Sequence, residues 1–274
     1  MASSSETLRI VTDPAHGGRW TSLRAEGGRE WLWRRADPAR EGVVPGDAFV
    51  DVGGVEECVP TVRGVPDHGD AWGRVWTRGG AGGEDGGGAE SVRCEGFSLT
   101  RTVCDGRAEA EVDYVLAADP GFRFVWAAHA LLDLSPRATL HLPDGASTRL
   151  YPSADGPWVE GSWPAPRGVA LDRLGPDDGT AVGAVVDADR CCVHDDEDRL
   201  TLSVRAADGQ PVSIALWRNL GGFPAERPYR SIGVEPMVGR VFDLAEAGPG
   251  DAGRVPASGE ARWRLTLSAG CGCP

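Results

Sequence analysis

Short segments in which apolar and polar residues alternate strictly are the most constraining feature of this sequence. In residues 108–116 the even positions are apolar and the odd positions are mostly charged, as a half-buried strand requires. Residues 122–134 repeat the pattern, with Phe, Phe, Trp, Ala, Ala, Leu and Leu at the even positions. No segment has a helical period of convincing length, so the sequence predicts an all-β protein.

Further short strands are predicted where β-forming runs end in glycine-rich turns. Asp208-Gly209 is predicted to form a hairpin turn between two of these strands. Residues 55–61 and 66–76 are expected to be irregular, and the glycine-rich residues 79–88 to form a flexible surface loop. The further predicted strands are residues 8–12, 19–24, 30–35, 47–52, 138–142, 180–187, 199–205, 212–219 and 261–268.

Many short strands with closely spaced turn signals predict a large antiparallel β-sandwich. Neither an internal repeat nor a linker divides the chain, so residues 1–274 are expected to form one domain.

The charge of the chain argues against several kinds of partner. The 274 residues carry a formal net charge of −13, and every basic residue is an arginine. Such a surface repels nucleic acids and anionic membranes, and it offers phosphorylated substrates no long-range attraction. No apolar run approaches the length of a membrane span, and no apolar signal segment follows the polar residues 1–6.

A cytoplasmic location is therefore expected, with the seven cysteines reduced. Cys271 and Cys273 could bind a metal or form a tight disulfide, but a frayed tail is the simpler interpretation.

Glu235 is the first candidate for chemistry. Pro236 keeps Glu235 extended, because the residue before a proline avoids the α region. A glutamate at the end of a strand can act as a general base, although most carboxylates are solvated surface groups. Two histidine segments strengthen the case, residues 66–69 with His68 and residues 126–132 with His129.

The alternation in residues 122–134 also orients His129. If the segment is one continuous strand, Phe124 and Trp126 face the core and His129 faces the other side, with Arg123 and Asp133. His129 is therefore predicted to lie on a more polar face, where a cleft could form.

Four segments, in this order and spacing, resemble the aldose 1-epimerase (galactose mutarotase-like) family. They are residues 53–61, the stretch Pro66-Asp67-His68-Gly69 with Trp76 closing its loop, residues 126–134, and residues 216–224 together with 232–236. Residues 17–23 and 259–265 also resemble the first and last strands of that family, so the resemblance covers nearly the whole chain.

The resemblance implies a large antiparallel β-sandwich, the supersandwich, with an active site in a groove across one sheet. It implies an isomerase that interconverts the α and β anomers of a free sugar without a metal or an organic cofactor. Glu235 then corresponds to the general base, His129 to the general acid, and His68 to a histidine that binds the sugar near its ring oxygen. The residues expected to bind substrate are Glu57, Arg74, Trp76, Trp217 and Asn219.

These residue types suit the reaction. Mutarotation removes a proton from the anomeric hydroxyl and delivers one to the ring oxygen, which requires a base and an acid with pKa values near neutrality. A carboxylate in a partly apolar groove can be raised toward that range, and histidine starts there. Other acid–base chemistry would use the same residues.

Departures from the family pattern leave the substrate open. Trp72 stands where the hexose-6-phosphate branch has an arginine, which argues against a sugar phosphate. Ala128 stands where galactose mutarotases have an asparagine, and the aspartate with which those enzymes bind sugar hydroxyls has no assigned counterpart. The alternatives are a non-catalytic carbohydrate-binding protein and an isomerase or lyase of a non-sugar metabolite. The partner expected is a small sugar, and the protein a monomer or a homodimer. His16, His141 and His194 are interpreted as structural or surface residues.

Overall fold

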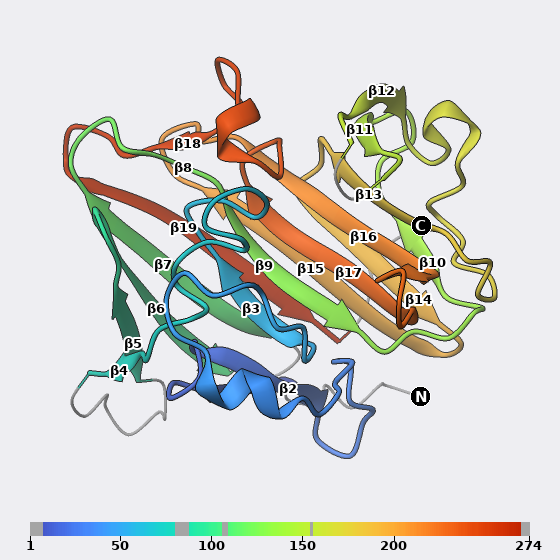
Figure 1. Cartoon of the computed structure of the whole chain (residues 1–274), viewed down its shortest axis with the longest axis horizontal. Coiled ribbons are helices and arrows are strands. Elements are labelled where there is room, and N and C mark those ends of the chain that lie inside the picture. Colours follow the sequence, from blue (N-terminus) through green and yellow to red (C-terminus); the bar gives the residue numbers. More distant parts are fainter. Residues whose placement is uncertain (1–7, 80–87, 106–108, 154–155, 270–274) are drawn as a thin grey trace.

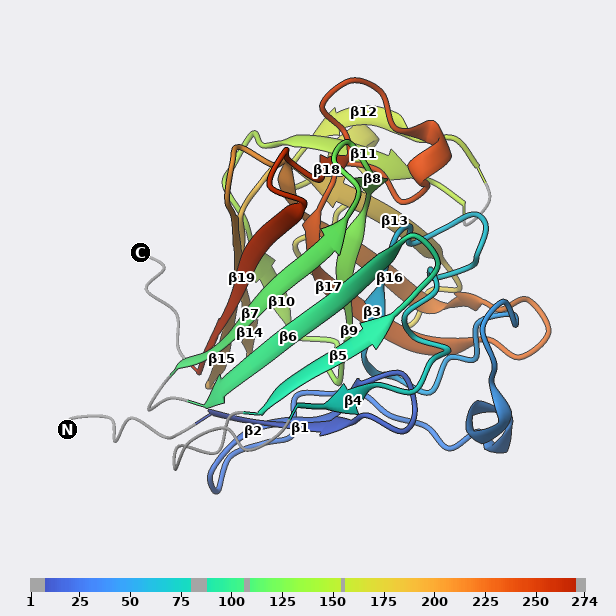
Figure 2. The ribbon, with the colours of Figure 1, turned by 90° about the vertical axis from the view of Figure 1, so that its left-hand side faces the viewer.

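The computed structural model describes residues 8–79, 88–105, 109–153 and 156–269. Within these ranges two large antiparallel sheets pack face to face, which confirms the predicted all-β sandwich (Figures 1 and 2). The helical elements there are three short 3-10 helices, η1 Pro38–Gly42, η2 Pro166–Gly168 and η3 Leu244–Glu246.

The first sheet has the strand order β1-β2-β3-β9-β17-β16-β13-β11-β12. Its strands are β1 Leu8–Asp13, β2 Arg19–Ala25, β3 Gly54–Cys58, β9 Trp126–Leu132, β11 Ser147–Tyr151, β12 Val159–Ser162, β13 Ala181–Val186, β16 Val212–Phe223 and β17 Tyr229–Val238.

The second sheet has the strand order β10-β14-β15-β19-β7-β6-β5-β4. Its strands are β4 Thr77–Arg78, β5 Ala89–Arg93, β6 Phe97–Asp105, β7 Glu109–Ala118, β10 Thr139–His141, β14 Arg190–Asp195, β15 Asp198–Ala206 and β19 Glu260–Ser268. A separate two-stranded pair is formed by β8 Arg123–Phe124 and β18 Gly253–Arg254.

The hydrophobic core lies between the two sheets. In β9 and β17 the core residues are even-numbered, including Trp126 and Val234. Odd-numbered residues of the same strands therefore face the outside of the first sheet, because successive side chains of a strand point to opposite faces. This places His129 away from the inter-sheet core, as the alternation predicted.

Two of the predicted strands are not strands in the structure. Residues 30–35 form only isolated bridges, such as Leu32 to Leu132 and Arg34 to Gly53, because they run across the ends of β3 and β9. Residues 47–52 pair with no strand and form part of a loop that lines the groove described below. The apolar residues of this segment suggested a strand, but in the structure they form part of the wall of the groove.

The opposite correction applies to residues 55–61, which were expected to be irregular. Residues 54–58 form β3, and all five of them are buried. The two carboxylates in this segment suggested a loop, but each has a buried cationic partner, Arg40 for Glu56 and Arg101 for Glu57.

The predicted strand 122–134 is divided at Val125, whose N–H donates to the Pro60 carbonyl. Arg123 consequently pairs with Arg254 in the β8–β18 pair, and its guanidinium donates to the Ala247 carbonyl, so it does not lie beside His129. Asp133 follows the end of β9 and is exposed.

The Asp208-Gly209 turn is also placed differently from the prediction. It joins β15 to β16, and these strands belong to different sheets. It is therefore a crossover between layers and not the turn of a hairpin.

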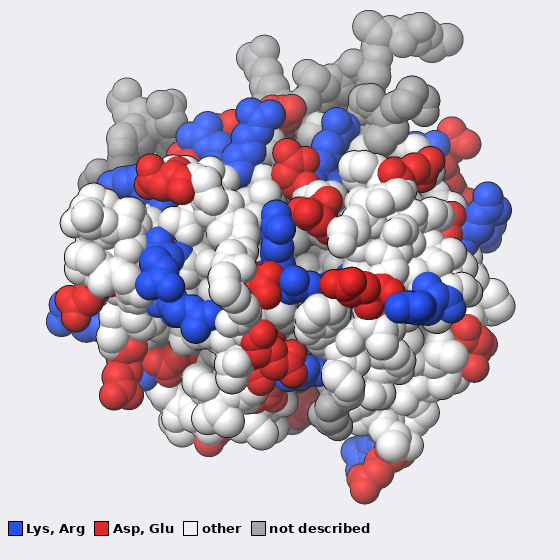
Figure 3. All heavy atoms as spheres, turned by 90° about the horizontal axis from the view of Figure 1, so that it is seen from above, with Lys and Arg blue, Asp and Glu red and all other residues white. Residues whose placement is uncertain are grey.

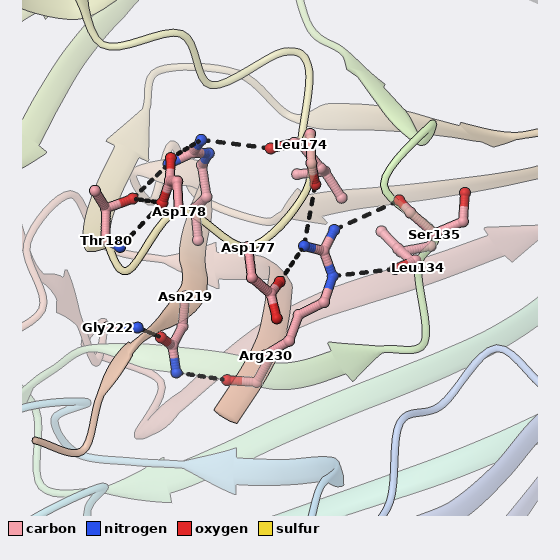
Figure 4. Close-up of polar contacts among 12 residues, drawn as sticks. Leu134, Ser135, Leu174, Asp177, Asp178, Thr180, Asn219, Gly222 and Arg230 are labelled. Carbon is pink, nitrogen blue, oxygen red and sulfur yellow. Dashed lines mark hydrogen bonds and ion pairs between the residues drawn. The ribbon is translucent and has the colours of Figure 1, made fainter. Parts of the chain in front are cut away.

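Arginines close one end of the sandwich. Arg218 in β16 and Arg230 in β17 occupy even positions, which hold core residues elsewhere in these strands. Both guanidinium groups reach the loop of residues 174–180, Arg218 through Asp178 and Arg230 through Asp177. Figure 4 shows the contact between Arg230 and Asp177. Arg230 also donates to the Leu134 carbonyl, so this loop and the end of β9 are tied together.

Charges are mixed on the face seen in Figure 3, where acidic and basic side chains lie among a larger uncharged area. None of the helices in the described ranges is long and apolar enough to cross a membrane. The described cysteines, Cys58, Cys94, Cys104, Cys191 and Cys192, are free thiols, as predicted. Cys271, Cys273 and most of the predicted 79–88 loop lie outside the described residues.

Candidate active site

A groove of about 600 Å³ lies on the outer face of the first sheet. Its lining residues come from β9, β11, β13, β16 and β17, and from loops on either side of β3. Figures 1 and 2 show the loops between β2 and β4 on the outer side of this sheet. The groove falls within the size range in which proteins bind small organic ligands.

His129 and Glu235 meet in this groove because their strands are neighbours. The pairs Gly233 to Leu131 and Met237 to Ala127 set the register of β17 against β9, and this register places Glu235 opposite His129. Their side chains touch, with His129 Nδ1 2.9 Å from Glu235 Oε1. The sequence-predicted acid and base, 106 positions apart in the chain (235 minus 129), are therefore in contact.

Burial and neighbouring charge act in opposite directions on His129. Burial alone would lower the pKa of His129, but the contact with Glu235, with help from Asp51 and Glu56, outweighs it and raises the pKa to about 9. His129 is thus an imidazolium at neutral pH. Glu235 is 1% exposed, and its second oxygen, Oε2, is buried without a hydrogen-bond partner among the described residues.

A glycine makes room for this carboxylate. A Cβ atom at Gly233 would lie 2.4 Å from Glu235 Oε1 and 3.0 Å from the Trp217 Cβ, so a larger residue at this position would displace the carboxylate. The pairing of β17 with β9 is also interrupted between Gly233 and Met237. Pro236 lies in that interval and has no N–H to donate to a ladder.

His68 reaches the groove from the loop that precedes β4. Its backbone has a φ of 57°, and its ring stacks on Phe49 with centroids 3.6 Å apart. The His129 ring lies 5.2 Å away, edge to face. His68 Nδ1 is 2.9 Å from Asp67 Oδ1. Burial lowers the pKa of His68, and although Asp67 opposes this, the charge on His129 adds to the lowering.

Of the residues expected to bind substrate, Trp217 lies in the groove and four others do not. Glu57 is completely buried between the sheets, where it accepts hydrogen bonds from Arg101, Tyr114 and Trp126. It cannot bind substrate there, because adjacent strand residues face opposite sides and Glu56, not Glu57, faces the groove side.

The other three have structural contacts. Trp76 is 2% exposed in the core, under the guanidinium of Arg101. Arg74 forms an ion pair with Asp70 at 2.8 Å and is not among the lining residues. Asn219 is fully buried and shapes the end of β16, accepting from the Gly222 and Phe223 amides and donating to the Phe223 carbonyl (Figure 4).

Several lining residues were not predicted, and most come from segments whose composition suggested a strand or a plain loop. Asp51 accepts a hydrogen bond from the Tyr229 hydroxyl, and the guanidinium of Arg35 lies over the Tyr229 ring. Phe49 and Tyr151 add aromatic walls. The one signal that could have suggested Asp51 is its position just before the Gly53-Gly54 pair of the family-like segment.

A second buried ion pair lies beside His129. Glu56 is the cross-strand neighbour of His129 in β3, and Arg40 binds it through Nε and Nη2 at 3.1 to 3.2 Å. Burial raises the pKa of Glu56 to about 7 despite the opposing charges of Arg40 and Arg19. Arg40 also donates to the His16 and Trp72 carbonyls and so joins three loops beneath the groove.

In the described ranges, no group of three or more histidine, cysteine, aspartate or glutamate side chains is placed to hold a metal ion.

Comparisons with known proteins bear on the fold. No protein-family model and no curated protein matches the sequence. Among solved structures, a protein from Escherichia coli K12 that is provisionally named an aldose 1-epimerase matches with a TM-score of 0.70 and 12% identity, covering 97% of this chain and 96% of its own. A galactose mutarotase related enzyme from Lactobacillus acidophilus matches with a TM-score of 0.67 and 12% identity, covering 97% and 95%.

A galactose mutarotase-like protein from Lactobacillus casei matches with a TM-score of 0.66 and 14% identity, covering 96% of this chain and 97% of its own. These likenesses extend over the whole described architecture. The chain therefore has the galactose mutarotase-like fold, which confirms the fold that its motifs implied.

Proposed function

We propose that the protein is a cofactor-independent aldose 1-epimerase that interconverts the α and β anomers of a free, uncharged sugar. The observation that carries this proposal is the contact between Glu235 and His129 at 2.9 Å inside the groove. A buried carboxylate and an imidazolium side by side are the base and the acid that mutarotation needs.

The reaction follows from the charges of this pair. Glu235 removes the proton of the anomeric hydroxyl through Oε2, the oxygen that has no partner in the described residues. His129 delivers a proton to the ring oxygen from Nε2, since its Nδ1 faces Glu235. The C1–O5 bond breaks, the aldehyde rotates about the C1–C2 bond, and the ring closes with both proton transfers reversed.

The groove stays electrically balanced through these steps. The ion pair of Glu235 and His129 becomes a neutral acid and a neutral imidazole when the ring opens, and it returns to an ion pair when the ring closes. No net charge is created in a buried site, where an unpaired charge would be costly.

The lining favours a sugar without a phosphate. Arg35 and Arg63 are the arginines of the lining, and each already faces a carboxylate, Asp37 at 3.4 Å and Glu246 at 2.9 Å. Asp51 and Tyr229 supply polar atoms for sugar hydroxyls, and Trp217 supplies an aromatic face. Asp51 is accordingly our candidate for the hydroxyl-binding aspartate that the sequence left unassigned.

Polarimetry on freshly dissolved α-D-glucose and α-D-galactose tests the proposal. We expect the wild type to speed anomeric equilibration above the buffer rate, and Glu235→Gln and His129→Asn each to lose about 10²- to 10⁴-fold in kcat/KM. Glu111→Gln, at a partly exposed position, and His141→Asn, at an exposed one, are the matched controls in the second sheet.

A wild-type rate equal to buffer for a panel of free aldoses would refute the epimerase assignment. Calorimetric titration of the same sugars would then separate the two alternatives. Binding without turnover would indicate a carbohydrate-binding protein, and absence of binding would indicate a non-sugar metabolite.

A further inference from the structure

The contact between Asp67 and His68 determines where the proton of His68 resides. Asp67 Oδ1 lies 2.9 Å from His68 Nδ1. Hydrogen bonding to His68 and to the Phe49 backbone outweighs burial and lowers the pKa of Asp67, so this carboxylate is ionised and only accepts hydrogen bonds. Nδ1 of His68 must therefore carry the proton that is shared with Asp67.

His68 and His129 differ in the strength of their carboxylate partners. The partner of His129, Glu235, has a side chain only 1% exposed, so its charge acts at nearly full strength. The side chain of Asp67 is 48% exposed, and water screens its charge. An imidazolium at His129, with its ring centroid 5.2 Å away, also repels a second positive charge. Of these two rings, His129 takes the charge and His68 stays neutral.

The loop holds the His68 ring in one orientation. Phe49 stacks on the ring with an interplanar angle of 9°, and the Phe49 amide also binds Asp67. The carbonyl of Asp67 accepts from Trp72 Nε1 at 3.0 Å. A left-handed backbone at a histidine costs free energy and persists only where the surroundings enforce it, as these contacts do. The ring therefore turns Nδ1 to Asp67 and leaves Nε2 for the groove, which His68 lines.

We propose that Asp67 holds His68 as the Nδ1–H tautomer, so that its Nε2 accepts a hydrogen bond from a non-anomeric hydroxyl of the substrate. This rests on the proposed function for the identity of the substrate. A ring oxygen has no hydrogen to donate, so His68 does not bind it, and this differs from the role that the family resemblance implies. The ring oxygen is left to His129, and Asp67 is a positioning residue that selects sugars with a hydroxyl at the matching carbon.

The tautomer can be measured without any substrate. In ¹⁵N-labelled protein, the imidazole signals of His68 are assigned by their loss in His68→Asn. We expect the wild type at pH 7.5 to show a protonated Nδ1 and an unprotonated Nε2. In Asp67→Asn the amide can donate to Nδ1, and we expect the Nε2–H form to gain population. Asp196→Asn, an exposed change at a residue whose φ of 54° suits asparagine, is the matched control.

A series of monodeoxy sugars, with the hydroxyl removed at C2, C3 or C4 of glucose, tests the consequence for specificity. We expect the wild type to lose about tenfold in kcat/KM for one member of the series, relative to glucose, because an acceptor is left unpaired. We expect Asp67→Asn to discriminate against that member clearly less, with its loss on glucose seen mainly in KM.

Two results would overturn the proposal. One is an Nε2–H signal for His68 in the wild type, and the other is equal use of all the deoxy sugars. If the wild type accelerates no aldose at all, the proposed function fails, while the nitrogen signals still decide the tautomer. The two failures are therefore distinguishable.

Discussion

Two buried clusters of opposite charges lie on the two faces of the first sheet, and they differ in how completely their atoms are paired. Between the sheets, Arg101 binds Glu57, Glu90 and the Gly18 carbonyl, and Glu57 also accepts from Tyr114 and Trp126. On the groove side, His129 Nδ1 and Glu235 Oε1 form an ion pair at 2.9 Å, but within the described residues neither His129 Nδ1 nor Glu235 Oε2 has a hydrogen-bond partner.

This difference in pairing distinguishes a cluster that stabilises the fold from one that can react with a ligand. A buried charge whose every polar atom is paired holds the fold together and has no capacity left for a ligand. A buried carboxylate with an unpaired oxygen, facing a groove, can take a proton from a bound hydroxyl. Glu56 and Glu57 show that the two faces can be adjacent in sequence, because successive side chains of β3 point to opposite sides of the sheet.

The largest effect is expected from removing the cation of the paired cluster. Arg101→Met leaves Glu57 buried without its positive partner and leaves Glu90 with the exposed Arg78 alone, and we expect the free energy of unfolding to fall by about 3–5 kcal/mol. Urea denaturation measures this. Arg264→Met, which removes an exposed guanidinium from Asp113 and Glu111, should cost less than about 1 kcal/mol. Similar losses of unfolding free energy in Arg101→Met and Arg264→Met would show that the buried cluster does not stabilise the fold more than an exposed ion pair does.

The ion pair of His129 and Glu235 should make the free energy of unfolding depend on pH. The folded pKa of His129 is about 9, above its ordinary value of 6.5, so its protonation stabilises the fold fully below about pH 6.5. This contribution is lost as the pH rises through 9, and it amounts to on the order of 3 kcal/mol. We expect the stability difference between wild type and Glu235→Gln to shrink from pH 6 to pH 10. A difference that is constant with pH would contradict the charged pair.

The same titration should limit activity on the alkaline side. If the proposed function holds, kcat/KM for the sugar should fall as the pH rises through about 9, because His129, the proposed general acid, loses its proton. Polarimetry in a buffer series from pH 6 to pH 10 measures this limb. A rate that stays flat to pH 10 would show that His129 is not the proton donor.

A smaller effect is expected from a side chain at position 233 that displaces the carboxylate of Glu235, the proposed base. In Gly233→Ala the new Cβ would press on Glu235 Oε1, and we expect a loss of about tenfold in kcat/KM as the carboxylate is displaced. Gly42→Ala, where a Cβ meets nothing within 4 Å, is the control. Full activity in Gly233→Ala would show that the position of Oε1 is not critical.

The smallest effect is expected from neutralising Glu56, the neighbour of His129 in strand β3. Glu56→Gln removes one of the negative charges that raise the pKa of His129. We expect the alkaline limb of kcat/KM to move to lower pH by less than about one unit, because Arg40 already offsets much of this charge. An unchanged limb would confine the control of His129 to Glu235 and Asp51.

The sequence alone determined the sandwich and the orientation of its central strands. The alternation in residues 122–134 correctly placed His129 opposite to the core-facing Phe124 and Trp126, because a strand has a period of two whatever it packs against. The ordered motifs implied the mutarotase-like fold and singled out Glu235, His129 and His68, which the structure brings into one groove.

Only the tertiary structure decided which polar residues are buried, and on which face. Glu57, Trp76 and Asn219 carried the composition of a binding site, but Glu57 and Trp76 contact Arg101 in the core and Asn219 shapes a strand end. Phe49, Asp51 and Asp67 entered the groove because loops fold over β3 and β9, and no local pattern encodes that contact. The geometry of a strand depends on neighbouring residues and can be predicted from them. The site consists of residues that are distant in the sequence and come together only when the sandwich has folded.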